Sequence, residues 1–206
     1  MSNSFEVHNL FPKYIFKTNI GVNESLINFC NQQNYVRMES NNGDFSDDFQ
    51  ILKKTSNDLD KTLIRHIRIF LDKGLNLNLH KHWPEIVCSW IVRHGKGDFA
   101  HNHWHENSHF SCVYYINQED NGNIWFENDA KSNITFPGFK FDYTDDNAFN
   151  CNNYKLNVTS GDLILFPSHM LHNVEKNLKD TYRYSLAFNI FMKGSFGKEE
   201  YQLEIR

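Results

Sequence analysis

The sequence lacks the features that define several protein classes. Its four cysteines, among 206 residues, form no Cys-x-x-Cys pair, so their spacing indicates neither a zinc ribbon nor a disulfide framework. The net charge is −4 with histidines counted as neutral, which leaves no basic footprint for nucleic acid. No apolar run approaches the length of a membrane span. We expect reduced, mostly buried thiols and predict neither nucleic-acid nor membrane binding.

The first residues also lack the pattern of a secretory signal. The stretch "MSNSFEVHNLFPKYIFK" carries an acidic residue and a proline where such a signal has an unbroken apolar core. We therefore expect a cytoplasmic protein.

Helical patterns are confined to residues 22–80. The stretch "NESLINFCNQQ" begins with Asn23 as a cap, and "SNDLDKTLIRHIRIFLDKGLNL" has Ser56 or Asn57 at its start and Gly74 at its end. The second pattern carries one apolar stripe, formed by Leu59, Leu63, Ile64, Ile67, Phe70 and Leu71. Between the two helices, "ESNNGDFSDDF" is polar and acidic and is predicted to be a surface loop.

From about residue 84 the pattern changes to short strands separated by Gly, Asn or Asp. They are "EIVCSWIVRHG", "HFSCVYYIN", "GNIWFEN", "YKLNVTSGDLILFP", "MLHNVEK" and "YRYSLAFNIFM". Helices followed by many antiparallel strands predict an α+β chain whose residues 84–206 form a double-stranded β-helix, a jelly-roll or cupin-like barrel. No boundary separates independent domains, so 1–206 is predicted to be one domain, with an N-terminal strand and supporting helices in residues 1–80.

Residues 128–153 form a long polar and aromatic insertion. It contains Phe136, Phe139, Phe141, Tyr143 and Phe149. A segment of this length inside a compact domain is typical of a lid or binding loop. Its aromatic residues fit a homodimer contact equally well.

Histidines suggest a metal site. In "HNHWHENSHFSCVYYI", His101, His103 and His105 alternate ahead of a strand, and in extended chain alternate side chains share a face. At least two imidazoles can therefore converge on one metal ion. In "SGDLILFPSHMLHNV", a Gly161-Asp162 turn, a buried strand and a stop at Pro167 place His172 at the start of the next strand, where it can complete the site. The neighbouring Trp104 is expected to serve packing.

These stretches resemble the 2-oxoglutarate and iron(II)-dependent oxygenases, in particular the prolyl-hydroxylase-like branch found in bacteria and phages. "NLFPKYIFK" looks like the opening strand of that family. The resemblance implies that His103, His105 and His172 bind iron. It also implies that Arg183 holds the far carboxylate of 2-oxoglutarate, with Ser185 of the Arg-x-Ser motif and Tyr115 beside it.

The implied reaction uses Fe(II), 2-oxoglutarate and O₂. It hydroxylates or otherwise oxidises an unidentified small molecule or peptide and releases succinate and CO₂. The sequence departs from the commonest family pattern at His105, where a carboxylate is usual. Three neutral imidazoles would leave the metal site with the full 2+ charge of the ion, whereas two imidazoles and a carboxylate would leave 1+. A shifted frame, His101 with His103, and an oxygen ligand from Glu106 rank below this set.

Two other classes are consistent with parts of the pattern. Metal-binding cupins also have Gly, five residues and His-x-His, as Gly97 and His103 show, and would imply a 2-oxoglutarate-independent dioxygenase, an isomerase or a sensor. However, no glutamate follows at the expected spacing, and His169 stands where a cupin usually has glycine. A structural protein with a vestigial site is the third class. Arg183-x-Ser185 and the N-terminal "LFP" favour the oxygenase.

Overall fold

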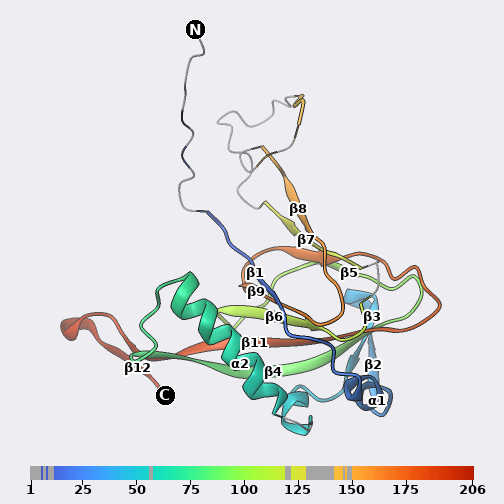
Figure 1. Ribbon diagram of the computed structural model, residues 1–206, viewed down its shortest axis with the longest axis horizontal. Coiled ribbons are helices and arrows are strands. Elements are labelled where there is room, and N and C mark those ends of the chain that lie inside the picture. Colours follow the sequence, from blue (N-terminus) through green and yellow to red (C-terminus); the bar gives the residue numbers. More distant parts are fainter. Residues whose placement is uncertain are drawn as a thin grey trace.

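Two antiparallel β-sheets face each other in the computed structural model (Figure 1), which describes residues 6, 8, 12–55, 58–118, 122–128, 142–145, 147 and 150–206. The large sheet has the order β1-β9-β6-β11-β4-β3-β2, with β12 added to β11, and the small sheet has the order β5-β10-β7-β8. The strands of the large sheet are β1 Phe16–Asn19, β2 Tyr35–Met38, β3 Gly43–Ser46, β4 His82–His94, β6 Phe110–Tyr115, β9 Asp162–Pro167, β11 Arg183–Phe196 and β12 Leu203–Ile205. Those of the small sheet are β5 Ala100–His103, β7 Ile124–Glu127, β8 Asn153–Leu156 and β10 His172–Val174. The architecture is the predicted double-stranded β-helix.

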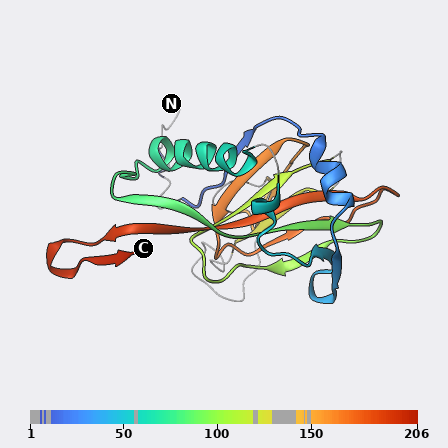
Figure 2. The same ribbon diagram turned by 90° about the horizontal axis from the view of Figure 1, so that it is seen from below.

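Both α-helices cover the outer face of the large sheet (Figure 2). They are α1 Ser25–Asn31 and α2 Leu59–Ile69, and α2 continues into the π-helical turn η3 Phe70–Gly74. Short 3₁₀ turns occur at η1 Glu39–Asn41, η2 Ile51–Lys54 and η4 Glu199–Tyr201. The buried face of α2 and η3 consists of Leu59, Leu63, Ile67 and Leu71, which confirms the predicted stripe. The predicted caps Ser56 and Asn57 lie outside the described residues.

The two faces of the large sheet differ in chemistry. Along β11 the side chains that pack in the outer core, beneath the helices, are Tyr184, Leu186, Phe188 and Ile190. Because successive residues of a strand point to opposite faces, the intervening side chains point between the sheets. They are Arg183, Ser185, Ala187 and Asn189. β11 therefore presents small and polar groups to the inner space, where a site can form.

The stretch predicted as a surface loop between the helices contains a strand, so that prediction is wrong. β3 pairs with β2 on one side and β4 on the other. The Ser46 hydroxyl is buried, accepts a hydrogen bond from the Ile91 backbone N–H at 3.0 Å, and donates one to the Asp48 carbonyl at 3.0 Å. A polar residue thus satisfies a strand position, which a search for apolar alternation misses.

The first 80 residues also contribute β1, which pairs with β9 of the barrel. The large sheet therefore contains strands from residues 1–80 as well as from residues 84–206. The division of the domain into these two parts stays a prediction. The turn before β9 has Gly161 at φ +87, where a Cβ would lie 2.8 Å from the Gly21 carbonyl carbon. Only glycine fits this turn without strain.

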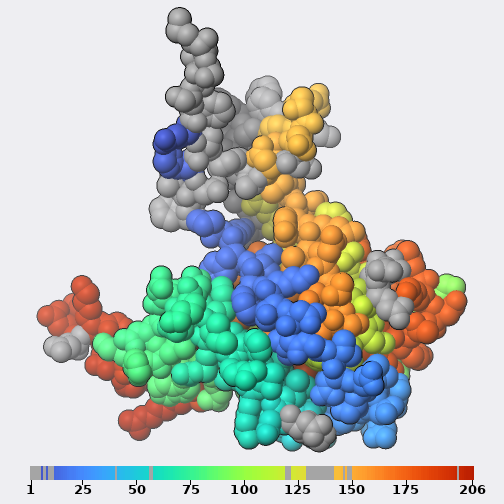
Figure 3. Space-filling model, viewed as in Figure 1, coloured from blue at the N-terminus to red at the C-terminus, as the bar shows by residue number. Residues whose placement is uncertain are grey.

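Two projections extend from the sandwich (Figure 3). The hairpin of β11 and β12 extends at one end, and β7 and β8 extend at another (Figure 1). Of the predicted insertion, most aromatic residues lie outside the described part of the chain, and Tyr143 is exposed. All four cysteine thiols are free. Among the described residues, no helix is long and apolar enough to span a membrane.

Candidate metal centre and carboxylate anchor

Three histidines meet at one end of the small sheet, on the side that faces the space between the two sheets. His103 ends β5, His172 begins β10, and the two are directly paired in the antiparallel register. His105 follows two residues after the end of β5. One ligand nitrogen from each of the three lies within 4.8 Å of the others. The structure thus brings together the three residues predicted to bind metal.

Backbone carbonyls orient two of the rings. His103 Nδ1 lies 2.7 Å from the His101 carbonyl oxygen, and His172 Nδ1 lies 2.8 Å from the Met170 carbonyl oxygen. A carbonyl only accepts, so each Nδ1 carries the proton and each Nε2 keeps its lone pair. Such outer contacts are typical of metal-binding histidines, since they fix the tautomer and the ring orientation.

Burial keeps all three imidazoles neutral. It lowers the pKa of His103, and burial together with repulsion from His103 lowers the pKa of His105 to about 4. The pKa of His172 is lowered well below its ordinary value, mainly by burial. Neutral imidazole is the form that binds metal, so the cluster is ready to accept a cation at neutral pH.

The alternative ligands lie outside this cluster. His101 and Glu106 are both exposed, and the His101 ring instead contacts Phe99 with a centroid distance of 4.6 Å. Trp104 is 58% exposed, so the prediction that it serves packing is wrong. Because it lies between two inward-pointing histidines of an extended segment, its side chain points outward.

Arg183 is a buried cation on the facing sheet. Its side chain is 7% exposed, and Nη2 donates to His94 Nδ1 at 2.8 Å and to the Glu175 carbonyl at 3.0 Å. Nη1 has no hydrogen-bond partner in the described part of the chain. Among the described residues, no carboxylate forms an ion pair with Arg183. Burial lowers its pKa to about 10, so it remains charged at neutral pH. A buried, unpaired charge is costly, which favours a site that takes an anion.

The inner face of the large sheet connects Arg183 with the histidines. Residues directly opposite on neighbouring strands share a face. On this basis Ser185, Val92 and Tyr115 form one row, and the next row contains Ala187, Trp90 and Val113. The Trp90 ring lies 5.7 Å from the His105 ring. The face therefore runs from Arg183 over the small side chains Ser185 and Ala187 to the histidine cluster.

Tyr115 and Ser185 lie next to each other and beside Arg183 on the inner face. Tyr115 is 3% exposed and belongs to the inner core. Burial raises the pKa of its phenol, so the group stays protonated and can donate a hydrogen bond.

Sequence reasoning missed His94, Trp90 and Gly122. His94 and Trp90 stand at alternating positions of a strand that was predicted, but nothing in that pattern links them to Arg183 or His105, which are distant in sequence. Gly122 packs against Arg183 from the loop before β7. The contact of His94 with Arg183 follows only from the register of β4 against β11. The contact of Gly122 with Arg183 follows only from the folded structure.

An antiparallel double-stranded β-helix with three histidines at one end defines a metal-binding barrel protein. Residues 88–189 match the family described as "Putative 2OG-Fe(II) oxygenase". That range includes the three histidines, Arg183, Ser185 and Tyr115. Residues 88–189, the part of the chain that carries the site, belong to the 2-oxoglutarate/Fe(II)-dependent oxygenase family. A search of curated proteins found no match.

Solved structures share the fold at low sequence identity. A prolyl-4-hydroxylase of Pseudomonas putida has a TM-score of 0.55 and 15% identity, covering 87% of this chain and 92% of that one. HygX of Streptomyces hygroscopicus, with nickel and 2-oxoglutarate bound, has a TM-score of 0.55 and 11% identity over 87% and 83% of the two chains. The α-ketoglutarate-dependent epimerase SnoN of nogalamycin biosynthesis has a TM-score of 0.60 and 12% identity over 88% and 81%.

Proposed function

We propose that this oxygenase binds Fe(II) through His103, His105 and His172 and hydroxylates an unidentified small molecule or peptide. In this proposal 2-oxoglutarate and O₂ are consumed, and succinate and CO₂ are released. Arg183 binds the far carboxylate of 2-oxoglutarate, and Ser185 and Tyr115 donate hydrogen bonds beside it. The fold alone does not specify hydroxylation, since an α-ketoglutarate-dependent epimerase has a similar fold.

The observation that carries the proposal is that the buried Arg183 forms no ion pair with a carboxylate of the described residues and lies on the same inner face that reaches the histidine cluster. Its planar fork suits a carboxylate, and the charge persists throughout the working pH range. The histidine cluster contains no carboxylate among the described residues. A divalent metal bound by these histidines keeps its 2+ charge. This charge favours binding of the 2-oxo acid end of 2-oxoglutarate, the end opposite to the carboxylate at Arg183.

The chemistry that metal and cosubstrate supply when bound is oxidation of an unactivated C–H bond by O₂. The chain provides the rest. Three neutral imidazoles, two of them with fixed tautomers, bind the metal. Arg183 fixes the position of the cosubstrate, and the apolar residues of the inner core exclude water from the space beneath. The inner core comprises Tyr115, Ile124, Phe126, Val158, Ile164, Phe166 and Met170.

The test is an anaerobic titration of the Fe(II)-loaded protein with 2-oxoglutarate, followed by the weak visible charge-transfer band of a chelated 2-oxo acid. We expect the band in the wild type. Arg183→Gln should retain iron and require about 10-fold to 100-fold more 2-oxoglutarate, since a hydrogen bond to a charged group contributes about 1.5–3 kcal/mol.

The metal assignment has its own control. His103→Ala and His172→Ala should lose stoichiometric iron, whereas His101→Ala, on the same strand but exposed, should retain it. Absence of the band in iron-replete wild type would rule out the 2-oxoglutarate assignment and favour a cupin-type metal protein. Loss of iron in His101→Ala alone would contradict the ligand set.

A further inference from the structure

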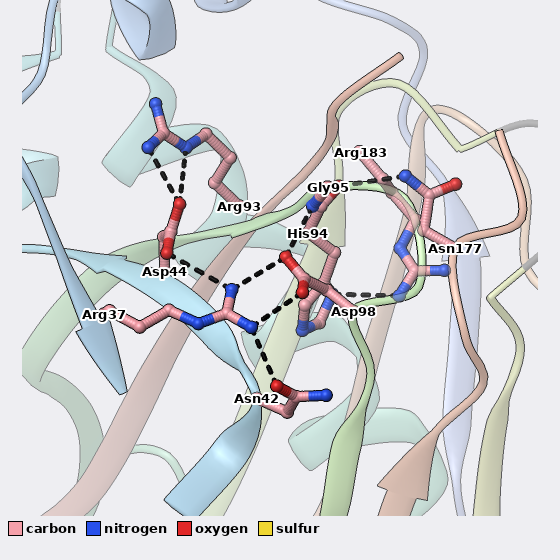
Figure 4. A network of polar contacts seen from close by, with 9 residues as sticks. All are labelled: Arg37, Asn42, Asp44, Arg93, His94, Gly95, Asp98, Asn177 and Arg183. Carbon is pink, nitrogen blue, oxygen red and sulfur yellow. Dashed lines mark hydrogen bonds and ion pairs between the residues drawn. The ribbon is translucent and has the colours of Figure 1, made fainter. Parts of the chain in front are cut away.

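The guanidinium of Arg183 rests on a neutral side chain instead of a counter-ion (Figure 4). His94 is the last residue of β4 and lies directly opposite Arg183 in the register with β11. It is 3% exposed, and its Nδ1 accepts the hydrogen bond from Arg183 Nη2. An arginine has no acceptor of its own, so the imidazole must present the lone pair of Nδ1.

Hydrogen bonds fix the peptide group that joins His94 to Gly95. Asn177 Nδ2 donates to the His94 carbonyl at 2.9 Å and to the Thr181 carbonyl at 2.8 Å. The next backbone N–H, that of Gly95, donates to Asp98 Oδ2 at 2.8 Å. These contacts fix the backbone from which the His94 ring reaches Arg183.

The ring also fills a space that only glycine provides. A Cβ on Gly43 of β3 would lie 2.7 Å from His94 Cδ2 and 2.8 Å from Nε2. Nε2 is buried and meets no hydrogen-bond partner among the residues that the structure describes. The fold therefore accepts an unpaired ring nitrogen in order to keep Nδ1 directed at Arg183.

The carboxylates around this pair are bound by other groups. Asp98 accepts from Arg37 at 2.8 and 2.9 Å, and Asp44 pairs with Arg93 at 2.8 Å (Figure 4). The carboxylate of Glu175 accepts hydrogen bonds from Asn123, Trp125 and Lys155, and only its backbone carbonyl contacts Arg183. The positive charge of Arg183 is consequently available to a ligand.

Gly122 limits the other nitrogen of the fork. It has φ +92, and a Cβ there would lie 1.5 Å from Nη1 and 2.3 Å from Cζ of Arg183. The guanidinium thus occupies the place of the missing side chain. Nη2 is fixed by hydrogen bonds and Nη1 by packing against this backbone.

We propose that His94 is a positioning residue: it fixes the orientation of the Arg183 fork while leaving its charge free for the far carboxylate of the cosubstrate, with Gly122 as the backbone surface behind the fork. This inference rests on the function proposed above. A carboxylate in place of His94 would also hold the fork, but it would compete with the cosubstrate for the charge.

Three substitutions of similar size distinguish a residue that orients the Arg183 guanidinium from one that also neutralises its charge. His94→Asn offers Oδ1, which like Nδ1 is bonded to Cγ, as a neutral acceptor. His94→Leu offers no acceptor, and His94→Asp offers a charged one. The dissociation constant of 2-oxoglutarate is measured anaerobically on Fe(II)-loaded protein by calorimetry and by the visible band, with iron content determined for each variant.

We expect all three variants to bind one iron. His94→Asn should stay within about 3-fold of the wild-type dissociation constant, and His94→Leu and His94→Asp should weaken binding by about 10-fold or more, the scale of one hydrogen bond to a charged group. In turnover the change should appear in KM for 2-oxoglutarate and not in kcat. Equal affinity in wild type, His94→Leu and His94→Asp would overturn the inference.

Gly122→Ala provides an independent test that does not alter His94. Gly21 is the matched control, because its φ is +86 and a Cβ there would meet nothing within 4 Å. Both substitutions strain the backbone, but only Gly122→Ala displaces the guanidinium. We expect weaker 2-oxoglutarate binding for Gly122→Ala alone, and equal binding by the two variants would contradict the inference.

The outcomes distinguish this inference from the proposed function. If Arg183→Gln loses 2-oxoglutarate while His94→Leu and Gly122→Ala bind as the wild type does, the positioning role fails and the proposed function stands. If iron-loaded wild type binds no 2-oxoglutarate, the proposed function fails and the role of His94 fails with it.

Discussion

At the scale of single residues, the protein places several histidines where protonation is unfavourable. His94 shows this most clearly. Burial, with a smaller contribution from the Arg183 charge, lowers its pKa to about 3 from an ordinary value of 6.5. Between these two values the unfolded chain binds a proton that the folded chain excludes, so the free energy of unfolding falls as the pH falls.

His94→Asn should therefore reduce the acid sensitivity of the fold. One titrating group of this kind contributes roughly 1.4 kcal/mol per pH unit below its unfolded pKa. From pH 7 to pH 5, the wild type should lose about 2 kcal/mol more unfolding free energy than His94→Asn, as measured by urea denaturation of the metal-free protein. His80→Asn, at an exposed histidine, is the control. An equal loss in wild type and His94→Asn would contradict the buried neutral imidazole.

The sequence predicts the metal ligands because their spacing is local. His103 and His105 are two residues apart, and Pro167 marks where the chain turns before His172. The partner of Arg183 could not be predicted in this way. His94 is 89 positions away, and only the pairing of two long strands brings it opposite Arg183.

At the scale of elements, β3 shows how a polar stretch can form a strand inside a sheet. Its Ser46 hydroxyl supplies the acceptor that the backbone N–H of Ile91 requires, and Ser89 does the same for the backbone N–H of Leu52 at 3.0 Å. Hydrophobic alternation predicts strands that bury apolar side chains. It does not predict a strand whose buried side chains bind backbone groups, so "ESNNGDFSDDF" was assigned to a loop.

Ser46→Ala should destabilise the protein by about 1–3 kcal/mol, because it leaves the Ile91 N–H buried without an acceptor. The measurement is the urea midpoint, with the slope checked for two-state behaviour. Ser25→Ala is a matched control at an exposed hydroxyl that bonds Asn23, and it should change stability by less than about 0.5 kcal/mol. Similar values for the two variants would show that β3 does not depend on this contact.

At the scale of the whole molecule, the large sheet separates a supporting core from the functional one. The helices pack on its outer face, and the histidines and Arg183 lie on its inner side. Leu63, which is fully buried in α2, belongs to the outer core and is separated from the site by the sheet.

Leu63→Ala should therefore cost stability without changing the site. Removing a buried leucine side chain typically costs about 2–5 kcal/mol. The folded variant should still bind one iron with the wild-type dissociation constant for 2-oxoglutarate. Ile69→Ala, on the same helix but 51% exposed, should change the unfolding free energy by less than about 0.5 kcal/mol. Weaker 2-oxoglutarate binding by folded Leu63→Ala would show that the two cores are coupled.

The division of the site between the sheets has a further consequence. The imidazoles belong to the small sheet and the guanidinium to the large one. If the residues have the proposed roles, the dicarboxylate bridges the two sheets, with one end at the metal and the other at Arg183. Stacked sheets keep a spacing of about 10 Å, fixed by the side chains packed between them. Binding of the cosubstrate would therefore link the two sheets, and its affinity would depend on the packing between them as well as on the individual ligands.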